Sequence, residues 1–296
     1  NVSMYYASTA AAEALTCAVR VNGRKATQKG VVYVSQFVPP HRMQVIENYL
    51  QGAKTEIRIL EHSMDGHLDL KAAANAAGSC AVYVEQPNAF GELDAGISNL
   101  KSIVGENTAV IVGVDVVSLG LVEAPGNYGA DIVVGEGQPF GIGPTFGGPI
   151  YGIFACAKRY LRQMPGRIVG QTVDVDGKLA YTLTLSTREQ HIRRHRATSN
   201  ICSNETLIAL MGAMHMALLG PEGLEKLARR VAASTEATKQ AVLSIEGVEL
   251  VDPKAANFRE FAVILPIDAA VAVSFADAAG INAGLALGEW WDGMSR

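Results

Sequence analysis

Polar side chains follow each of the long apolar runs of the sequence, at the point where the run ends. Carboxylate, imidazole, hydroxyl and amide groups recur at these points, and such groups can bind and orient a small polar ligand. Loops are polar in any case, so no single member of the set indicates a site. Their recurrence after successive runs predicts one. The members are Ser35-Gln36, Glu61-His62-Ser63, Glu85-Gln86-Pro87-Asn88, Asp115 and Glu136-Gly137-Gln138.

Asp115 is the strongest candidate in this set, because it directly follows the apolar run at 110–114. A carboxylate in that position can pair with a cationic heterocycle. It can equally cap a short helix around Ser118 to Leu121. The sequence leaves both roles open.

A stretch rich in glycine and proline, from Gly129 to Gly152, lies around the last member of the set. Its backbone can approach a ligand closely or take positive φ at several places. An irregular crossover at a sheet edge fits the composition equally well. Gly135-Glu136-Gly137 does not continue into an amphipathic helix, so the stretch is a poor match to a dinucleotide-binding fingerprint.

The elements that must position these residues follow from the spacing of the apolar runs. Runs at 31–34, 56–60, 80–84, 108–114, 131–134 and 150–155 predict strands, and the continuous apolar run at 31–34 is typical of a strand that is covered on both faces. Helical patterns separate the first four: one opens at Pro39-Pro40, one spans 68–77 and one spans 93–104. The alternation predicts an α/β fold with a mainly parallel, doubly wound sheet, in which ligands bind beyond the carboxyl ends of the strands.

The two ends of the chain have a different character. Residues 1–20 predict a helix that Ser3 caps, or at whose start Ser3 contacts a ligand. Two helices are expected after Ser203 and from Pro221 towards Ile245. Short strands at 248–251 and 261–265 and a helix at 269–279 then predict a smaller α+β domain. We therefore divide the chain into a large α/β domain at 1–220, and a linking helix with a partial small domain at 221–296.

Composition excludes several classes of function. A formal net charge of −4 gives no general attraction to nucleic acid or to an anionic membrane, and we expect no membrane-spanning segment. The four cysteines are far apart and lack metal-ligand spacing, which favours reduced thiols and a cytoplasmic protein. The missing initial methionine and the apolar segment before Arg296 suggest that both ends are incomplete. The basic cluster at 188–196 favours a solvated helical face, with an anion site or partner surface as the functional alternative.

Several blocks of the sequence resemble the P-protein of the glycine cleavage system, and more narrowly its subunit 1, the alpha chain of the two-subunit bacterial type. The blocks occur in the family's order and cover nearly the whole chain. They are NVSMY at the start, QPNAFGELD at 86–94, PGNYGADIVVGEGQPFGIGPTFGGP, MPGRIVGQTVD and REQHIRRHRATSNICSNETL.

The resemblance implies a fold-type I pyridoxal-phosphate enzyme, glycine dehydrogenase (decarboxylating), an oxidoreductase of glycine catabolism. In that family glycine forms a Schiff base with the cofactor, carbon dioxide leaves, and the aminomethyl group passes to the lipoyl arm of the H-protein. Asp115 matches the carboxylate that pairs with the cofactor ring. Gln138, however, stands where the Schiff-base lysine is needed, and glutamine cannot form an imine.

The resemblance therefore implies a chain with no confident catalytic residue of its own. We expect pyridoxal phosphate to be held by a homologous beta chain and not to be bound covalently here. In dimers of this fold the site lies between the protomers, so this chain is expected to help wall it. The family's Asn-x-Ser-Met-Tyr is usually followed by an acidic residue and glycine, where this chain has Tyr6 and Ala7. The candidates to line the site are Ser3, Tyr5, Asp115, Ser118, Gln138, Gly147, Gly148 and Arg188.

Overall fold

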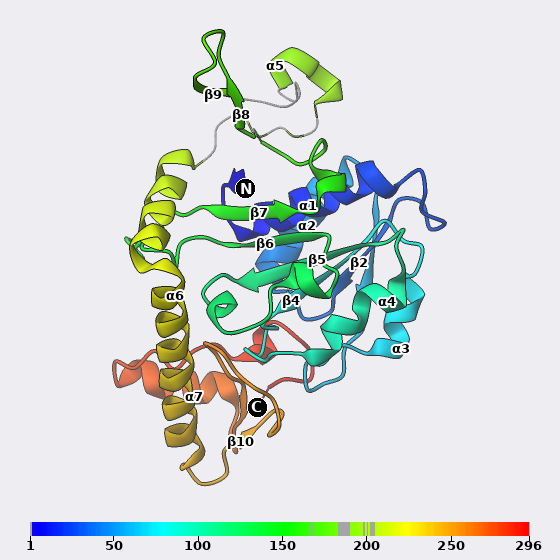
Figure 1. Ribbon diagram of the computed structural model, residues 1–296. Coiled ribbons are helices and arrows are strands. Elements are labelled where there is room, and N and C mark those ends of the chain that lie inside the picture. The colour runs from blue at the N-terminus through cyan, green and yellow to red at the C-terminus, as the bar shows by residue number, and fades with distance from the viewer. Residues whose placement is uncertain are drawn as a thin grey trace.

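A seven-stranded sheet forms the centre of the chain, which a computed structural model describes over residues 2–166, 168–182, 190–197, 199, 201 and 205–295. The strand order is β3-β2-β4-β5-β6-β7-β1 (Figure 1). Strands β3, β2, β4, β5 and β6 are mutually parallel, and β7 runs antiparallel to both β6 and β1. The strands are β1 (Val2–Met4), β2 (Val31–Ser35), β3 (Glu56–Leu60), β4 (Ala81–Gln86), β5 (Ala109–Asp115), β6 (Ile132–Glu136) and β7 (Gly152–Cys156).

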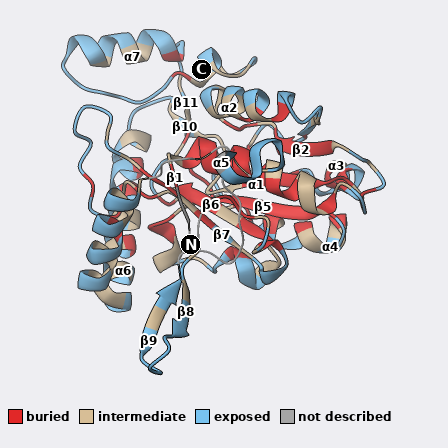
Figure 2. Cartoon of the chain, turned by 90° about the horizontal axis from the view of Figure 1, so that it is seen from above, coloured by how far each residue is buried: buried red, intermediate tan, exposed pale blue. Residues whose placement is uncertain are grey.

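Helices cover both faces of this sheet, as the alternation of strands and helices predicts. Side chains of one strand point alternately to opposite faces, so Val32 and Val34 pack with the helices of one layer, and Val31 and Tyr33 with those of the other. Figure 2 shows the resulting buried sheet between exposed helix surfaces. The α-helices are α1 (Ala7–Asn22), α2 (Pro40–Gln51), α3 (Leu70–Ala73), α4 (Leu100–Val104), α5 (Gln190–Arg193), α6 (Thr206–Leu243) and α7 (Ala269–Ala278).

Short 3-10 helices complete the connections between these elements. They are η1 (Ala74–Ala76), η2 (Ala95–Asn99), η3 (Ser118–Gly120), η4 (Pro125–Tyr128), η5 (Lys158–Tyr160), η6 (Arg194–Arg196) and η7 (Leu287–Glu289). The basic residues of η6 are exposed, as the expected solvated face requires.

The start of the chain differs from its prediction. Residues Val2–Met4 form an edge strand, so Ser3 lies opposite Ile153 in the sheet and does not cap a helix. Helix α1 begins only at Ala7, and Tyr6 is its N-cap residue. The backbone of Val2–Met4 pairs antiparallel with β7, which would otherwise be the edge strand of the sheet.

The long helix α6 flanks the sheet and leads to the C-terminal elements (Figure 1). By length and composition alone α6 is long and apolar enough to cross a membrane, whereas the sequence led us to expect no such segment. The backbone of Gly220 is non-helical, with φ of 62°, and divides α6 as the predicted start at Pro221 requires. The part of α6 before Gly220 is about 20 Å long at the helical rise per residue. It is therefore shorter than the hydrocarbon core of a membrane, which is about 30 Å thick.

The C-terminal elements include the two short strands and the helix that the sequence predicts. Strands β10 (Glu249–Leu250) and β11 (Val263–Ile264) pair antiparallel, and α7 follows them. Trp291 packs edge-on against Phe37 and Phe90 of the large domain. We propose the division at residue 220 as the domain boundary, because the break in α6 falls there.

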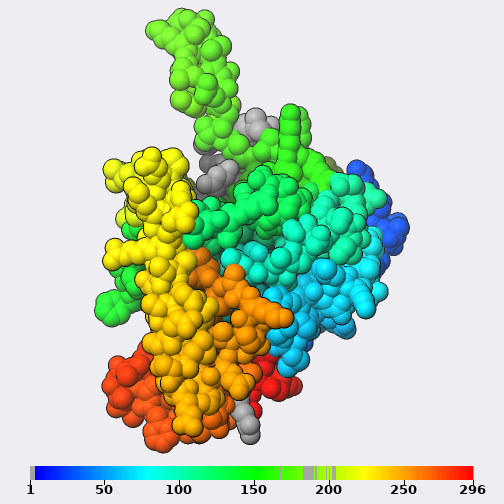
Figure 3. Space-filling model, turned by 60° about the horizontal axis from the view of Figure 1, so that its bottom comes forward, coloured from blue at the N-terminus to red at the C-terminus, as the bar shows by residue number. Residues whose placement is uncertain are grey.

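An antiparallel hairpin projects from the body of the chain. It is formed by β8 (Gly170–Val173) and β9 (Leu179–Thr182), and it stands clear of the other elements in Figure 3. Its apolar side chains Val173, Leu179 and Tyr181 are exposed. A two-stranded hairpin alone is marginally stable in water, and the described part of the chain leaves these apolar side chains uncovered.

Candidate functional site

The carboxyl ends of β5 and β6 bring the central candidates together. Asp115 lies opposite Glu136 in the parallel pair, and Glu136 lies opposite Gly152 in the next. Gly152 in turn lies opposite Met4 of β1, directly before helix α1. The register therefore aligns one row across the sheet, from Asp115 to the start of α1.

Asp115 is held by its own chain on both carboxylate oxygens. Its Oδ1 accepts hydrogen bonds from the backbone N–H groups of Val117 (2.8 Å) and Ser118 (3.3 Å). The guanidinium of Arg259, from the C-terminal part of the chain, donates to Oδ2 at 2.7 Å. Ser118 Oγ donates to the Asp115 carbonyl at 2.7 Å. The structure thus gives Asp115 a role in the turn at the end of β5, together with an ion pair that sequence reasoning missed.

Gln138 is also engaged within its own loop. Its Nε2 donates to the carbonyl oxygen of Ile142 at 2.6 Å, and its backbone N–H donates to Glu136 Oε1 at 3.2 Å. The side chain therefore fastens the first turn of the glycine-rich loop. No lysine occurs between Lys101 and Lys158, so the loops that follow β5 and β6 carry no amine nucleophile.

The glycine-rich loop between β6 and β7 needs glycine at specific places. A Cβ on Gly137 would lie 2.2 to 2.6 Å from ring atoms of Tyr151, so only glycine permits that close approach. Gly147 has φ of +100°, with open space around it. Gly148 follows it and precedes Pro149. The Tyr151 hydroxyl is buried against Gly212 of α6, which ties the base of the loop to that helix.

Ser3, Tyr5 and Arg188 are the remaining candidates to line the site. Ser3 contributes backbone to β1, which starts the row at Met4. Tyr5 is half-buried beside α2. The pKa of Tyr49 in that helix is raised, first by burial and then by Glu13 and Tyr5. Arg188 lies outside the described residues. The structure therefore collects Asp115, Ser118 and Gln138 at the strand ends, and it supplies Glu136 and Arg259 as their partners.

The signals for these two partners differ. Glu136 belongs to the strand-end set, although its partners were not predictable. Arg259 has no such signal, because it lies in an irregular loop 144 residues from Asp115.

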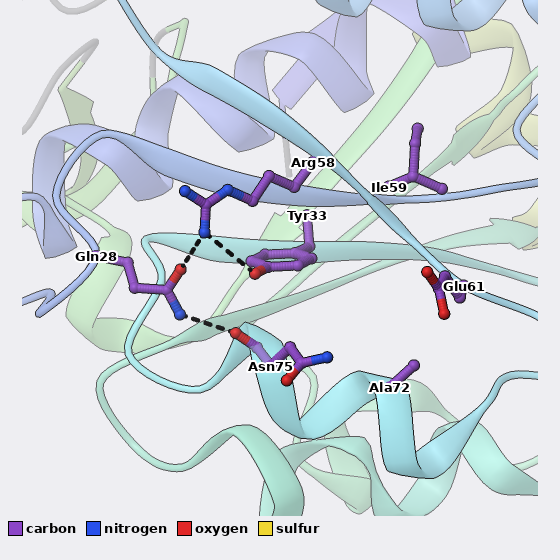
Figure 4. A pocket seen from close by; sticks show the side chains of 7 residues that line it. All are labelled: Gln28, Tyr33, Arg58, Ile59, Glu61, Ala72 and Asn75. Carbon is purple, nitrogen blue, oxygen red and sulfur yellow. Dashed lines mark hydrogen bonds between the residues drawn. The ribbon is translucent and has the colours of Figure 1, made fainter.

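A separate hollow of about 640 Å³ opens at the edge strand β3 (Figure 4). Arg58 crosses it and donates to Gln28 Oε1 at 2.9 Å and to the Tyr33 hydroxyl at 3.5 Å. Gln28 Nε2 in turn donates to the carbonyl oxygen of Asn75. These polar groups satisfy one another, and the hollow lies on the far side of the sheet order from β6, so we place the site at the strand-end row. The lining residues are Gln28, Tyr33, Arg58, Ile59, Glu61, Ala72 and Asn75.

A cluster of titratable groups joins the large domain to the C-terminal part. His67 Nε2 lies 2.8 Å from Asp252 Oδ2, and its Nδ1 lies 3.6 Å from Asp94 Oδ1. Glu92, only 2% exposed, approaches His67 at 4.0 Å. Burial raises the pKa of Glu92 to about 7. The pKa of His67 is also raised: burial opposes this, but the hydrogen bond to Asp252 and the surrounding carboxylates outweigh it.

This cluster should make the protein less stable as the pH rises from about 4.5 to above 7, because the pKa of Glu92 is raised from 4.5 to about 7 and that of His67 is raised from 6.5. Glu92 and His67 each have a folded pKa above the ordinary value. The stability that each contributes is therefore complete below the ordinary pKa and is lost as the pH passes the folded pKa. Asp252 has a lowered pKa and loses its contribution only in acid, outside this window. We expect the loss to be on the order of 2 kcal/mol, measured as the free energy of urea unfolding. Glu92→Gln should flatten the dependence of unfolding free energy on pH, whereas the exposed control Glu106→Gln should leave it as steep as in wild type. A dependence that is equally steep in both variants would contradict the assignment.

Comparison with known proteins was decisive for the family. The model of the glycine cleavage system P-protein family matches residues 1–283. The chain belongs to the glycine cleavage system P-protein family. This P-protein chain is 40% identical over 298 residues to the probable glycine dehydrogenase (decarboxylating) subunit 1 of Geotalea daltonii, covering 100% of this chain and 66% of that protein. With the protein of the same name from Caulobacter vibrioides it shares 42% identity over 288 residues, covering 96% and 62%.

Solved structures agree with this family. A crystal structure of glycine decarboxylase (P-protein) in inhibitor-bound form superposes with a TM-score of 0.84 at 37% identity, over 95% of this chain and 62% of that one. A cysteine desulfurase from Thermococcus onnurineus superposes with a TM-score of 0.60 at 18% identity, which supports the fold alone. The resemblance to subunit 1 and the fold-type I pyridoxal-phosphate architecture are thus confirmed. The P-protein chain spans about two thirds of the length of these relatives, or slightly less.

The residues at the strand ends of this P-protein chain do not fit a covalently bound pyridoxal phosphate. The position after β6 carries Gln138, whose amide is bonded to the loop. The Asp115 carboxylate is bonded to the backbone and to Arg259. The first N–H of α1, on Ala7, is bonded to Glu136. A ring nitrogen and a phosphate would each have to displace a partner from this chain.

Proposed function

We propose that this chain is the subunit of a heteromeric P-protein that supports glycine decarboxylation on a homologous beta chain. In this proposal the partner holds pyridoxal phosphate through its own lysine, and the aminomethyl group passes to the lipoyl arm of the H-protein. The single observation that carries it is the absence of any lysine between Lys101 and Lys158 in a chain of this family. The subunit 1 name of the relatives supports a second subunit. The setting that we propose is the cytoplasm, without nucleic acid or membrane as a partner.

The surface that we propose for the beta chain is an apolar stripe on the first part of α6. The stripe has the spacing of one helical face, and its side chains are exposed although the helix segment is strongly apolar. It consists of Leu207, Leu210, Met211, Met214 and Leu218. The same helix anchors Tyr151 at the base of the glycine-rich loop through Gly212. A partner seated on the stripe would therefore lie beside the loop that carries Gly147 and Gly148.

Reconstitution tests the proposal. Release of carbon dioxide from glycine is measured with the beta chain and H-protein, before and after this chain is added. We expect the rate to rise at least about tenfold, because the partner's site lacks one wall without this chain. An equal rate in the presence and absence of this chain would refute the proposal. Covalent capture of pyridoxal phosphate on this chain by borohydride, together with activity of the chain alone, would also refute it.

A scaffold that only stabilises the beta chain or docks the H-protein is the second candidate. The internal bonding of Asp115 and Gln138 favours it, because those side chains are not free for a ligand of the chain's own. The two candidates differ in what they require of the N-terminal corner. Ser3→Ala and Tyr5→Phe should lower the reconstituted rate if this corner lines the shared site, and Ser98→Ala serves as an exposed control. Full restoration by all three variants would favour the scaffold.

A further inference from the structure

Helix α1 begins at a point where it meets a carboxylate from a distant part of the chain. Glu136 is the last residue of β6, and its Oε2 accepts a hydrogen bond from the backbone N–H of Ala7 at 3.1 Å. Its Oε1 accepts one from the backbone N–H of Gln138 at 3.2 Å. The two oxygens therefore join the first residue of α1 to the loop that follows β6.

The start of a helix attracts anions, because its first N–H groups lack partners inside the helix and the helix dipole is positive there. Helix α1 has 16 residues, and its first turn is buried: Ser8 is 2% exposed. Burial makes an unpaired N–H group costly in that place. The Glu136 carboxylate meets this need, and burial raises its pKa although the hydrogen bonds from Ala7 and the loop lower it in part.

The neighbouring row of side chains is satisfied in the same way. Asp115, opposite Glu136 in the sheet, is paired with Arg259. Gln138 is bonded to Ile142. The start of α1, Asp115 and Gln138 would meet the phosphate, the ring and the carbonyl of a phosphorylated pyridine aldehyde, respectively. Each of the three thus already has a partner from this chain.

We propose that Glu136 is a built-in anion that closes this chain's own strand-end site to phosphate compounds. Its carboxylate takes the place at the start of α1 that a phosphate monoester would otherwise occupy. Glu136→Ala removes a carboxymethyl group, which is close in size to a phosphate ion, and exposes the N–H groups of Ala7 and Gln138. The variant should therefore gain a site for inorganic phosphate. This inference deepens the proposed function, since it says why the chain leaves the cofactor to its partner, but it concerns this chain alone.

Thermal unfolding of the chain with phosphate or chloride at matched ionic strength tests the inference. Wild type and the exposed-carboxylate control Glu123→Ala should show no rise in unfolding midpoint that is specific to phosphate. Glu136→Ala should unfold at lower temperature in chloride and recover by a few degrees in phosphate. A phosphate-specific rise in wild type, or a folded Glu136→Ala variant without one, would overturn the inference.

A second variant keeps the inference testable if Glu136→Ala does not fold. Glu136→Gln keeps the shape but loses the charge, so hydrogen exchange at the Ala7 and Gln138 amides should become faster than in wild type. Unchanged exchange at both amides would overturn the inference. Neither measurement involves the beta chain. A chain that fails to support the partner, but gains phosphate binding on loss of Glu136, would refute the proposed function and leave this inference standing.

Discussion

Replacing Leu210 and Met214 together by aspartate should lower the affinity for the beta chain at least about 100-fold, because two unpaired charges would enter the centre of an apolar interface. Both side chains lie on the α6 stripe and are 55% and 59% exposed in this chain. The double variant should therefore fold normally and lose the partner. Affinity is measured by titration of the beta chain, and folding by circular dichroism and unfolding temperature.

The matched control for this pair is Ile281→Asp. Ile281 is 60% exposed and apolar, but it lies in the C-terminal part and not on the stripe. Its substitution should leave the affinity unchanged. Equal affinities for the stripe variant, the control and wild type would show that the beta chain binds elsewhere, and the hairpin β8–β9 would then be the next surface to test.

Asp131→Ala should destabilise the chain by about 3 to 5 kcal/mol, since it removes one partner of a buried ion pair. The Asp131 carboxylate, 5% exposed, accepts from the backbone N–H of Val110 at 3.0 Å and from Lys101 Nζ at 3.0 Å. The guanidinium of Arg159 donates to its other oxygen. Without Asp131, the mostly buried ammonium of Lys101 would retain only the carbonyl of Thr108 and the distant, exposed Glu106. The free energy of urea unfolding measures the loss.

Two further variants separate the causes of this loss. Asp131→Asn keeps an acceptor for Val110 but removes the charge, so it should cost less than alanine. Glu106 pairs with Lys101 and Arg159 at 3.9 and 3.4 Å but is 81% exposed, and Glu106→Ala should cost less than about 1 kcal/mol. A loss of similar size for Glu106→Ala and Asp131→Ala would contradict the assignment of the energy to burial.

The inner strands β2, β4 and β5 of the central sheet were predictable from the sequence because they are mostly buried on both faces. Such strands read as continuous apolar runs, and the predicted run at 31–34 lies within β2, every residue of which is buried. The edge strand β3 is mostly exposed, although its predicted bounds of 56–60 coincide with the observed ones. The edge strand β1 was not predictable: three residues pair on one side only, and the alanines that follow extend a helical pattern back over them. The break at Gly220 was anticipated only indirectly, from Pro221.

The candidate site was predictable as a set of strand ends but not as a set of contacts. Asp115 and Gln138 were recognised from position and from family resemblance. The bonding of Asp115 and Glu136 depends on groups that are remote in the sequence: Ala7 is 129 residues from Glu136, and Arg259 is 144 residues from Asp115. Periodicity and local motifs report on neighbours within a few turns of chain. Only the fold shows that the polar row bonds to itself.

The hairpin β8–β9 has a consequence for how the chain must be made in the cell. Among the described residues neither of its strands has a neighbour on the outer side, so unpaired backbone groups and apolar side chains are exposed together. Such an edge is a template for pairing with another copy. Under the proposed function, a chain made in excess over the beta chain would aggregate through this edge, which favours production of the two polypeptides in matched amounts.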